Sequence, residues 1–238
     1  MDVEKSEGVK ESLGASPETN AIASTVKFTE SKYSTYFNGS GDIISGKLKA
    51  GDTLDFSGTF NSKSFIINIP LTITSTDGSA NLNDCYFSFI SGSDGSNISN
   101  LKAKQVSTAQ RPIFEAIGVS NLTFSKNDLF SNQTGSHPMT FNGVSKLRIL
   151  NNRLQCNAYT NTSGWGQPSV MVFRSSGNCN ISGNTVITND SMVFTLLDMV
   201  QIHQWEQPQK IQAMEIIFLT IPYIQLGNCL HLFVMPFS

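Results

Sequence analysis

The sequence predicts an all-β protein folded as a parallel β-solenoid, in which each coil of the chain stacks on the previous one. The first observation is a short pattern that occurs three times: V-S-N-L-T-F-S-K-N-D-L from Val119, V-S-K-L-R-I-L-N-N-R-L from Val144 and S-G-N-C-N-I-S-G-N-T-V from Ser176. The second is an apolar, strand-like run upstream of each copy, and the third is the punctuation by Asn, Gly and Ser. A period in the twenties built from such pieces is typical of a solenoid.

The three copies align position by position. The aligned sets are Leu122, Leu147 and Cys179; Phe124, Ile149 and Ile181; Leu129, Leu154 and Val186; and Asn127, Asn152 and Asn184. The upstream runs hold Phe114 and Ala116, Met139 and Phe141, or Met171 and Phe173. Because alternate residues of a strand face the same side, we expect the aligned apolar sets to form inward-facing stacks.

The chain before the repeats is expected to supply a linker and an end cap. Residues 1–24 are polar and aperiodic, which indicates a disordered segment or a linker. Tyr33, Tyr36 and Phe37 then precede a turn at Asn38-Gly39. Since the open end of a solenoid exposes its apolar stack, we interpret these aromatics as a cap, formed by a short helix. A sugar-binding aromatic cluster is the alternative.

Further strand-length apolar runs fill the stretch from residue 43 to residue 103. Leu54, Phe56 and, after Gly58, Phe60 alternate as in a strand with one buried face. Apolar runs on both sides of Pro70 indicate a corner or a strand start at this proline. With the three clear repeats, these runs predict about six coils in a solenoid domain spanning residues 25–190.

The aligned asparagines are expected at tight corners. There, Asn tolerates left-handed backbone geometry and bonds neighbouring backbone groups. Stacked asparagines can also hydrogen-bond one another along the axis. Asn127, Asn152 and Asn184 therefore predict a structural ladder, with a row of ligand-binding amides as the alternative.

The interval between the second and third asparagines is longer because of a polar insertion at residues 158–168. Its Trp165 lies between glycines, and an exposed indole can stack on a sugar or a peptide. Trp165 and Tyr159 are therefore the candidate binding residues, unless Trp165 packs against the flank of its own coil. Asn132 and Asn161 lie in N-x-S/T sequons within loops and are the candidate glycosylation sites of an exported protein.

Composition and motifs point away from several functional classes. The net charge of −2 gives no basic footprint for nucleic acid. Four cysteines, Cys85, Cys156, Cys179 and Cys229, show no C-x-x-C spacing, so no zinc or redox motif is predicted, and a disulfide stays open. Cys179 aligns with leucines and is expected to be a buried small apolar side chain.

The repeats contain no recognisable catalytic constellation. Acid–base cleavage of a glycosidic bond needs two carboxylates, and no pair falls on equivalent positions of neighbouring coils. Asp128 and Arg153 do occupy equivalent positions, which predicts an exposed ion pair of small energetic value. His137 is the single histidine of the repeat sequence, so a Ser-His-Asp triad or a metal site would lack parts. We predict no catalytic residues, no metal and no cofactor.

Several segments resemble adhesin-like surface proteins of methanogenic archaea. They are Y-S-T-Y-F from Tyr33, G-D-I-I from Gly41, K-A-G-D-T-L from Lys49 and F-I-I-N-I-P-L-T-I from Phe65, together with the Asn-rich coils. The resemblance covers residues 25–190. It implies a right-handed parallel β-helix of pectate-lyase-like architecture, displayed at the cell surface or outside the cell. It implies attachment to cells or glycans and transfers no catalytic residue.

The two ends of the chain depart from this pattern. No apolar secretory segment follows Met1. Residues 191–238 form an atypical apolar tail, which is either a poor membrane anchor or a frameshift product. A shifted frame through residues 214–223 permits the coil-like string G-N-N-I-S-N-N-T-V-Y. Membrane association is expected only if this tail is genuine.

The function expected from the sequence is non-enzymatic attachment to cells or glycans. The alternative is a lyase or hydrolase that acts on polysaccharide, which would need a carboxylate and a basic cluster on one face.

Overall fold

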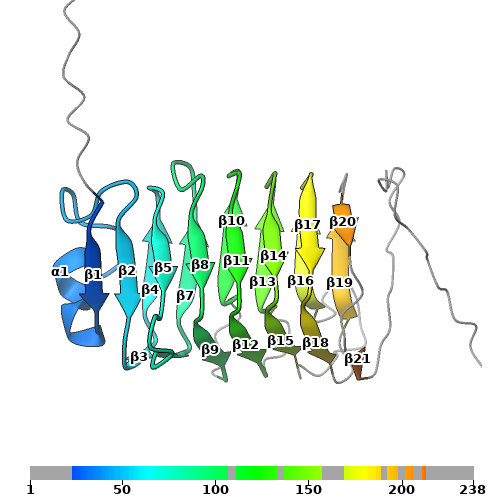
Figure 1. Ribbon diagram of the computed structural model, residues 1–238, viewed down its shortest axis with the longest axis horizontal. Coiled ribbons are helices and arrows are strands. Elements are labelled where there is room, and N and C mark those ends of the chain that lie inside the picture. The colour runs from blue at the N-terminus through cyan, green and yellow to red at the C-terminus, as the bar shows by residue number, and fades with distance from the viewer. Residues whose placement is uncertain are drawn as a thin grey trace, which may run out of the picture.

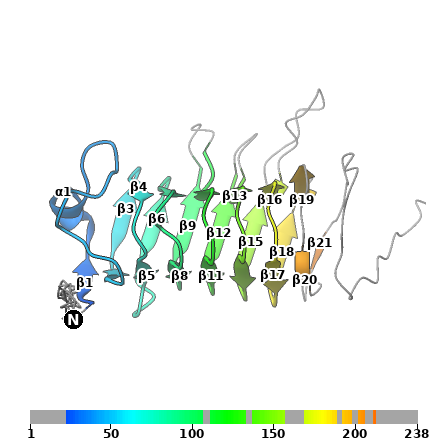
Figure 2. The ribbon, with the colours of Figure 1, turned by 90° about the horizontal axis from the view of Figure 1, so that it is seen from above.

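The computed structural model confirms a parallel β-solenoid with few helical residues. It describes residues 23–106, 111–132, 137–156 and 169–188, and the backbone of three later strands at 192–197, 202–205 and 211–212. The strands stack side by side along one long axis, with β1 and α1 at the same end (Figures 1 and 2).

In the described part of the chain, the strands form three parallel sheets. The first sheet contains β1 (Thr25–Phe28), β2 (Thr53–Phe56), β5 (Thr72–Thr74), β8 (Asn97–Ser99), β11 (Thr123–Ser125), β14 (Arg148–Leu150), β17 (Cys179–Ser182) and β20 (Ile202–Trp205). The second contains β4 (Ser64–Ile67), β7 (Tyr86–Phe89), β10 (Phe114–Ile117), β13 (Met139–Asn142), β16 (Ser169–Arg174) and β19 (Met192–Leu197). The third contains β3 (Thr59–Asn61), β6 (Asn81–Asn83), β9 (Lys102–Gln105), β12 (Asp128–Ser131), β15 (Arg153–Cys156), β18 (Thr185–Thr188) and β21 (Ile211–Gln212).

One turn of the solenoid contributes one strand to each sheet. The described strands from β2 to β16 make five such turns, and β17, β18 and β19 continue the same order. The expected count of about six coils over residues 25–190 is close to the number of turns that these strands make. Gly58, expected inside an irregular strand, separates β2 from β3 at a corner, where its φ of 84° suits glycine.

The strand register confirms the alignment of the three repeats. Phe124 pairs with Ile149, and Ile149 pairs with Ile181, in the first sheet. In the third sheet Leu129 pairs with Leu154, which pairs with Val186. All these side chains are buried. The inward-facing rows predicted from the period-two pattern are therefore present.

Stacked phenylalanines occupy the core along the solenoid axis. The rings of Phe65 and Phe87 stack at 4.4 Å between centroids, and Phe87 contacts Phe114 edge-on at 5.3 Å. The row continues through Phe124, Phe141 and Phe173, each ring 5.2 to 5.6 Å from the previous one. Aromatic pairs at such distances add about 0.5–1.5 kcal/mol each beyond the burial of their area.

The expected aromatic cap is present at the N-terminal end. Helix η1 (Glu30–Lys32) and α1 (Tyr33–Tyr36) lead into Phe37, which is 1% exposed. The rings of Tyr33 and Phe37 stack at 5.5 Å, and Tyr36 contacts Phe28 edge-on at 5.9 Å. The cap therefore closes the apolar column, and Figure 1 shows α1 beyond β1.

The corner between the first and third sheets differs from the prediction in one respect. The left-handed residue is the one before each asparagine: Lys126 (φ 56°), Asn151 (φ 56°) and Gly183 (φ 65°). The asparagines are not themselves left-handed, and their side chains hydrogen-bond neighbouring coils. Within the described residues they have negative φ.

Three strands follow the expected domain boundary at residue 190. The backbones of β19, β20 and β21 pair in parallel with β16, β17 and β18. Residues 1–22 and 213–238 lie outside the described residues. Of the cysteines, Cys85, Cys156 and Cys179 are buried and unbridged, while Cys229 lies outside the described residues.

Candidate functional site

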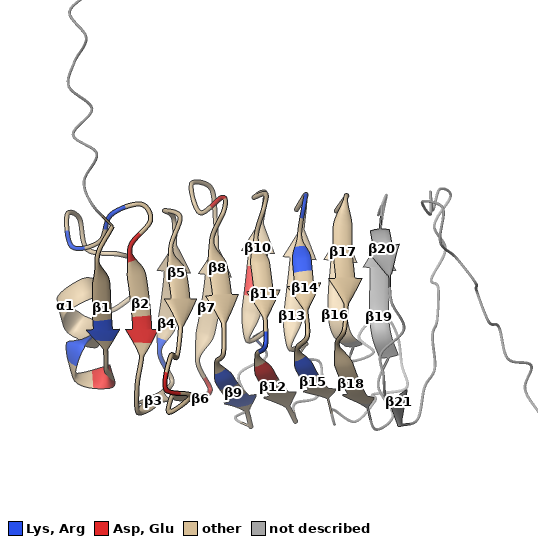
Figure 3. Cartoon of the chain, in the orientation of Figure 1, with Lys and Arg blue, Asp and Glu red and all other residues tan. Residues whose placement is uncertain are grey.

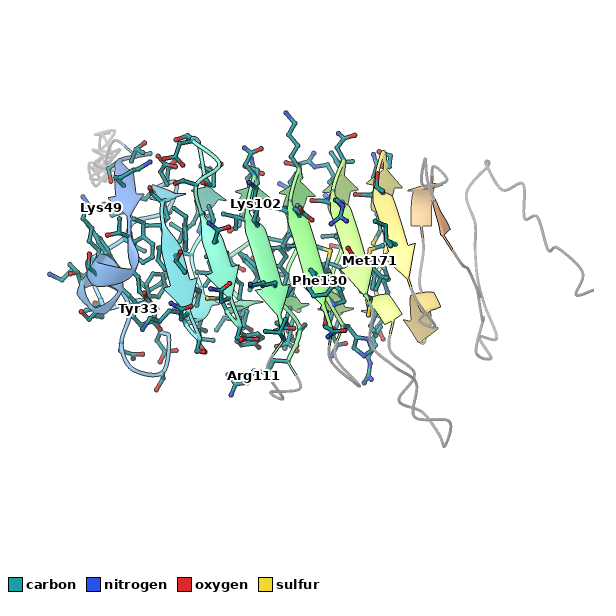
Figure 4. All side chains as sticks on the ribbon, turned by 90° about the horizontal axis from the view of Figure 1, so that it is seen from below. Tyr33, Lys49, Lys102, Arg111, Phe130 and Met171 are labelled. Atoms are coloured by element: carbon teal, nitrogen blue, oxygen red, sulfur yellow. The ribbon has the colours of Figure 1, made fainter. Side chains whose placement is uncertain are left out.

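A shallow groove lies on the outer face of the third sheet. The alternation that turns Leu82, Ala103, Leu129 and Leu154 into the core turns their neighbours outward. These neighbours surround a space of about 420 Å³. In Figure 1 the strands β9, β12, β15 and β18 follow the lower edge of the solenoid, so Figure 4, seen from below, looks toward this face.

Two parallel rows of side chains line the groove, because the strands pair in register. The first row is Asn81, Lys102, Asp128 and Arg153, and the second is Asn83, Lys104, Phe130 and Gln155. Each row runs across the strands, along the solenoid axis. Neighbouring members of a row are separated by one strand spacing, about 4.8 Å.

Three basic side chains and one carboxylate meet in the groove. Arg153 Nη1 donates to Asp128 Oδ1 at 2.9 Å, and Arg153 Nη2 donates to Gln155 Oε1 at 2.9 Å. The expected Asp128–Arg153 pair is therefore confirmed, with both side chains 46% exposed. Figure 3 shows the resulting alternation across β9, β12 and β15, coloured blue, red and blue.

The two lysines of β9 are left without an acidic partner in the described part of the chain. Lys102 and Lys104 are exposed, and neither ammonium group lies within ion-pair distance of a described carboxylate. The carboxylate of Asp128 is already held by Arg153. The groove therefore presents an excess of positive charge although the whole chain is slightly acidic.

Phe130 supplies an apolar surface in the middle of the groove. Its neighbours Leu129 and Ser131 are buried, so Phe130 points outward and stays half-buried among polar side chains. Lys104 on β9 and Gln155 on β15 flank it in the same row. An aromatic face bordered by amide and ammonium groups can pack against the apolar face of a sugar while its hydroxyl groups are hydrogen-bonded.

Trp165, Tyr159 and the sequon residue Asn161 lie outside the described residues. Asn132 is exposed directly after β12, where its backbone N–H donates to Gln105 O at 3.0 Å. The candidate glycosylation site Asn132 therefore adjoins β12, the strand that carries Phe130.

The aligned asparagines lie inside the corner and away from the groove. Asn127, Asn152 and Asn184 are 1%, 1% and 3% exposed. Asn152 Nδ2 donates to Asn184 Oδ1 at 2.9 Å and to Phe124 O at 2.9 Å. Asn127 Nδ2 donates in the same way to Asn152 Oδ1 and to Ile98 O. The amides are engaged with one another and with backbone.

Sequence reasoning did not single out Lys102, Lys104, Phe130 or Gln155. Their outward direction was readable from the alternation K-A-K-Q and D-L-F-S. Their proximity follows from the pairing of β9 with β12. The repeat pattern is weak in the coil that contains β9, so the sequence alone did not indicate this pairing.

A second polar cluster lies on the outer face of the second sheet. Tyr86 Oη donates to Glu115 Oε2, and the Arg111 guanidinium lies 5.6 Å from the centre of the Tyr86 ring. Burial and the bond to Glu115 raise the pKa of Tyr86 to about 12. Because Tyr86 interacts with both Glu115 and Arg111, we interpret the cluster as structural.

The described residues contain no group of three or more His, Cys, Asp or Glu side chains placed to hold a metal ion. Among them, no helix has the length and apolarity needed to span a membrane.

The fold and the groove define a parallel β-helix protein with an open, axially extended surface on one sheet. Comparison of the chain with family models, curated proteins and solved structures finds no match.

Proposed function

We propose that this protein is a non-enzymatic attachment protein that binds glycans through the groove of the third sheet. The observation that carries the proposal is Phe130, a half-buried aromatic side chain placed between polar residues on a rigid sheet. Strands hold such a surface more precisely than loops do, and a glycan loses less affinity to ordering when its site is preformed.

The resemblance to adhesin-like surface proteins supports the same function. It implies display at the cell surface or outside the cell, with glycans or other cell-surface molecules as partners. The exposed Asn132 sequon fits an exported protein. Trp165 and Tyr159, the candidate binding residues of the sequence, would add further contacts to a glycan.

A glycan array with the full chain tests this proposal. Phe130→Ala is expected to weaken binding to those arrayed glycans that the unmodified chain binds. Ile117→Ala is the matched control, because Ile117 is an exposed apolar side chain on β10 of the second sheet, 43% accessible. Trp165→Ala tests the insertion separately. Absence of binding to any glycan or cell surface overturns the proposal.

The second candidate function is a polysaccharide-active enzyme. It is favoured by one observation, the presence of Asp128 beside three basic side chains in one groove. Its test is release of new reducing ends or unsaturated sugars from polysaccharide, with Asp128→Asn as the inactive variant. Turnover that Asp128→Asn leaves unchanged would exclude this groove as the catalytic site.

A further inference from the structure

The charge of the groove specifies the class of glycan more narrowly than its shape does. Lys102 and Lys104 are two residues apart on β9, so their side chains leave the same face of the sheet about 7 Å from each other. Arg153 lies two strands further along the axis, about 10 Å away. These three cations face a single carboxylate, Asp128.

The fixed position of Arg153 matters as much as its charge. Its guanidinium group is held by Asp128 on one side and by Gln155 on the other. A guanidinium group has five N–H donors, so others stay available on the solvent side after these two bonds. The two ammonium groups of β9 each have three donors and no described acidic partner.

The two rows of side chains in the groove set the direction in which a bound glycan chain would lie. Both rows cross the strands from β6 to β15, so a linear chain lying in the groove runs along the solenoid axis. Such a chain would meet Asn81 and Asn83 first, the lysines next, then Phe130 and finally Arg153 with Gln155. Neighbouring contact points in each row are therefore about 4.8 Å apart along the axis.

We propose that the groove binds an anionic polysaccharide that carries carboxylate or sulfate groups and lies along the solenoid axis. This inference rests on the proposed glycan-binding function. Anionic groups of the chain pair with Lys102, Lys104 and Arg153, while Phe130 packs against a sugar face between them. A neutral glycan would cover the two lysines without supplying a counter-charge.

Binding measurements on the full chain with four soluble probes test the inference. The probes are galacturonate oligomers, their methyl esters, dextran sulfate and dextran, so that carboxylate and sulfate are each compared with a neutral partner. We expect at least one anionic probe to bind about tenfold or more tightly than its neutral counterpart. The preference should decrease as ionic strength rises.

Two double variants with equal loss of charge separate the groove from the rest of the surface. Lys102→Gln with Lys104→Gln removes the lysines of β9, whereas Lys47→Gln with Lys49→Gln removes two exposed lysines near the N-terminal cap. Figure 4 labels Lys49 at that end, several strands from Lys102. Only the first variant should lose the preference for anionic probes. Urea unfolding checks that both variants fold.

The outcomes distinguish the two proposals. Equal binding of anionic and neutral probes, or equal losses in the two double variants, overturns the inference but leaves glycan binding intact. Polyglutamate binding as tightly as the anionic glycans shows a general polyanion surface and also overturns the inference. No binding of any probe or arrayed glycan overturns the proposed function itself. Phe130→Ala should weaken anionic and neutral binding alike.

Discussion

Asn184 Oδ1 accepts two hydrogen bonds from Asn152, one from the backbone N at 2.8 Å and one from Nδ2 at 2.9 Å. Asn152 Oδ1 accepts the same two bonds from Asn127, at 2.9 and 3.0 Å. The corner is thus built by one repeated unit, in which each amide satisfies a backbone donor of the previous coil. Because these groups are buried, losing one member leaves partners that water cannot reach.

Replacement of Asn152 by alanine is expected to lower the free energy of unfolding by about 3 kcal/mol or more, because each stranded buried polar group costs about 1–3 kcal/mol. The change strands two donors of Asn127 and the carbonyl of Phe124. Urea unfolding measures the effect. Asn142→Ala is the matched control, since Asn142 is exposed at the end of β13 and should change stability by about 0.5 kcal/mol at most.

Phe65 joins the cap to the first turns. Its ring contacts Phe37 at 5.1 Å, Phe56 at 5.4 Å and Phe87 at 4.4 Å. Truncation to alanine should cost about 3–5 kcal/mol in unfolding free energy, and Phe65→Leu should cost clearly less. A Phe65→Ala variant with the stability of the unmodified chain would show that the N-terminal turns unfold independently of the remaining ones.

Stability should decrease in acid. Burial acts to raise the pKa of Asp55, but hydrogen bonds from Thr76 N and Oγ1, and from Lys27, outweigh it and lower the pKa below the ordinary value. A carboxyl with a lowered folded-state pKa contributes stability above its unfolded pKa of about 4, and this contribution is lost as pH falls through the folded pKa.

Asp55→Asn should therefore be less stable than the unmodified chain at neutral pH and should lose less stability on acidification. Denaturant unfolding at pH 7 and at successively lower pH measures both effects. The same direction is expected for Asp52, whose pKa burial would raise but bonds from Ser24 and Lys49 lower. Identical pH profiles for Asp55→Asn and the unmodified chain would contradict the assignment.

The buried thiols should be inert in the folded protein. Burial raises the pKa of Cys85 and of Cys179 to about 12 in each case, and the thiolate is the reactive species. In a Cys229→Ser variant, a thiol reagent at pH 8 should modify Cys85, Cys156 and Cys179 slowly until urea unfolds the chain. Rapid modification under native conditions would mean that the core opens readily.

Much of the fold was predictable because inward positions repeat. Leu129, Leu154 and Val186 recur at equal places in the pattern, and packing allows little else there. The aromatic cap was predictable for the same reason, since Tyr33 and Phe37 have no other apolar surface to cover. The left-handed corner was misplaced by one residue, because Lys126 carries no sign of its backbone geometry while Asn127 does.

The groove was not predictable to the same degree. Outward positions are free to vary, so Lys104, Phe130 and Gln155 share no residue type that an internal alignment could detect. Asp128 and Arg153 were paired in advance only because they fall within the clear repeats. Only the three-dimensional structure shows that β9 pairs with β12 and so brings Lys102 and Lys104 beside Asp128.

The unequal spacing of the asparagine ladder shows where a coil can take up additional sequence. Asn127 and Asn152 are 25 residues apart and Asn152 and Asn184 are 32 apart, yet Arg153 still pairs with Thr185. The added length enters between β15 and β16, at the junction of the third and second sheets. This junction accepts foreign sequence without shifting the coils, which makes it the natural place to graft a peptide epitope onto the scaffold.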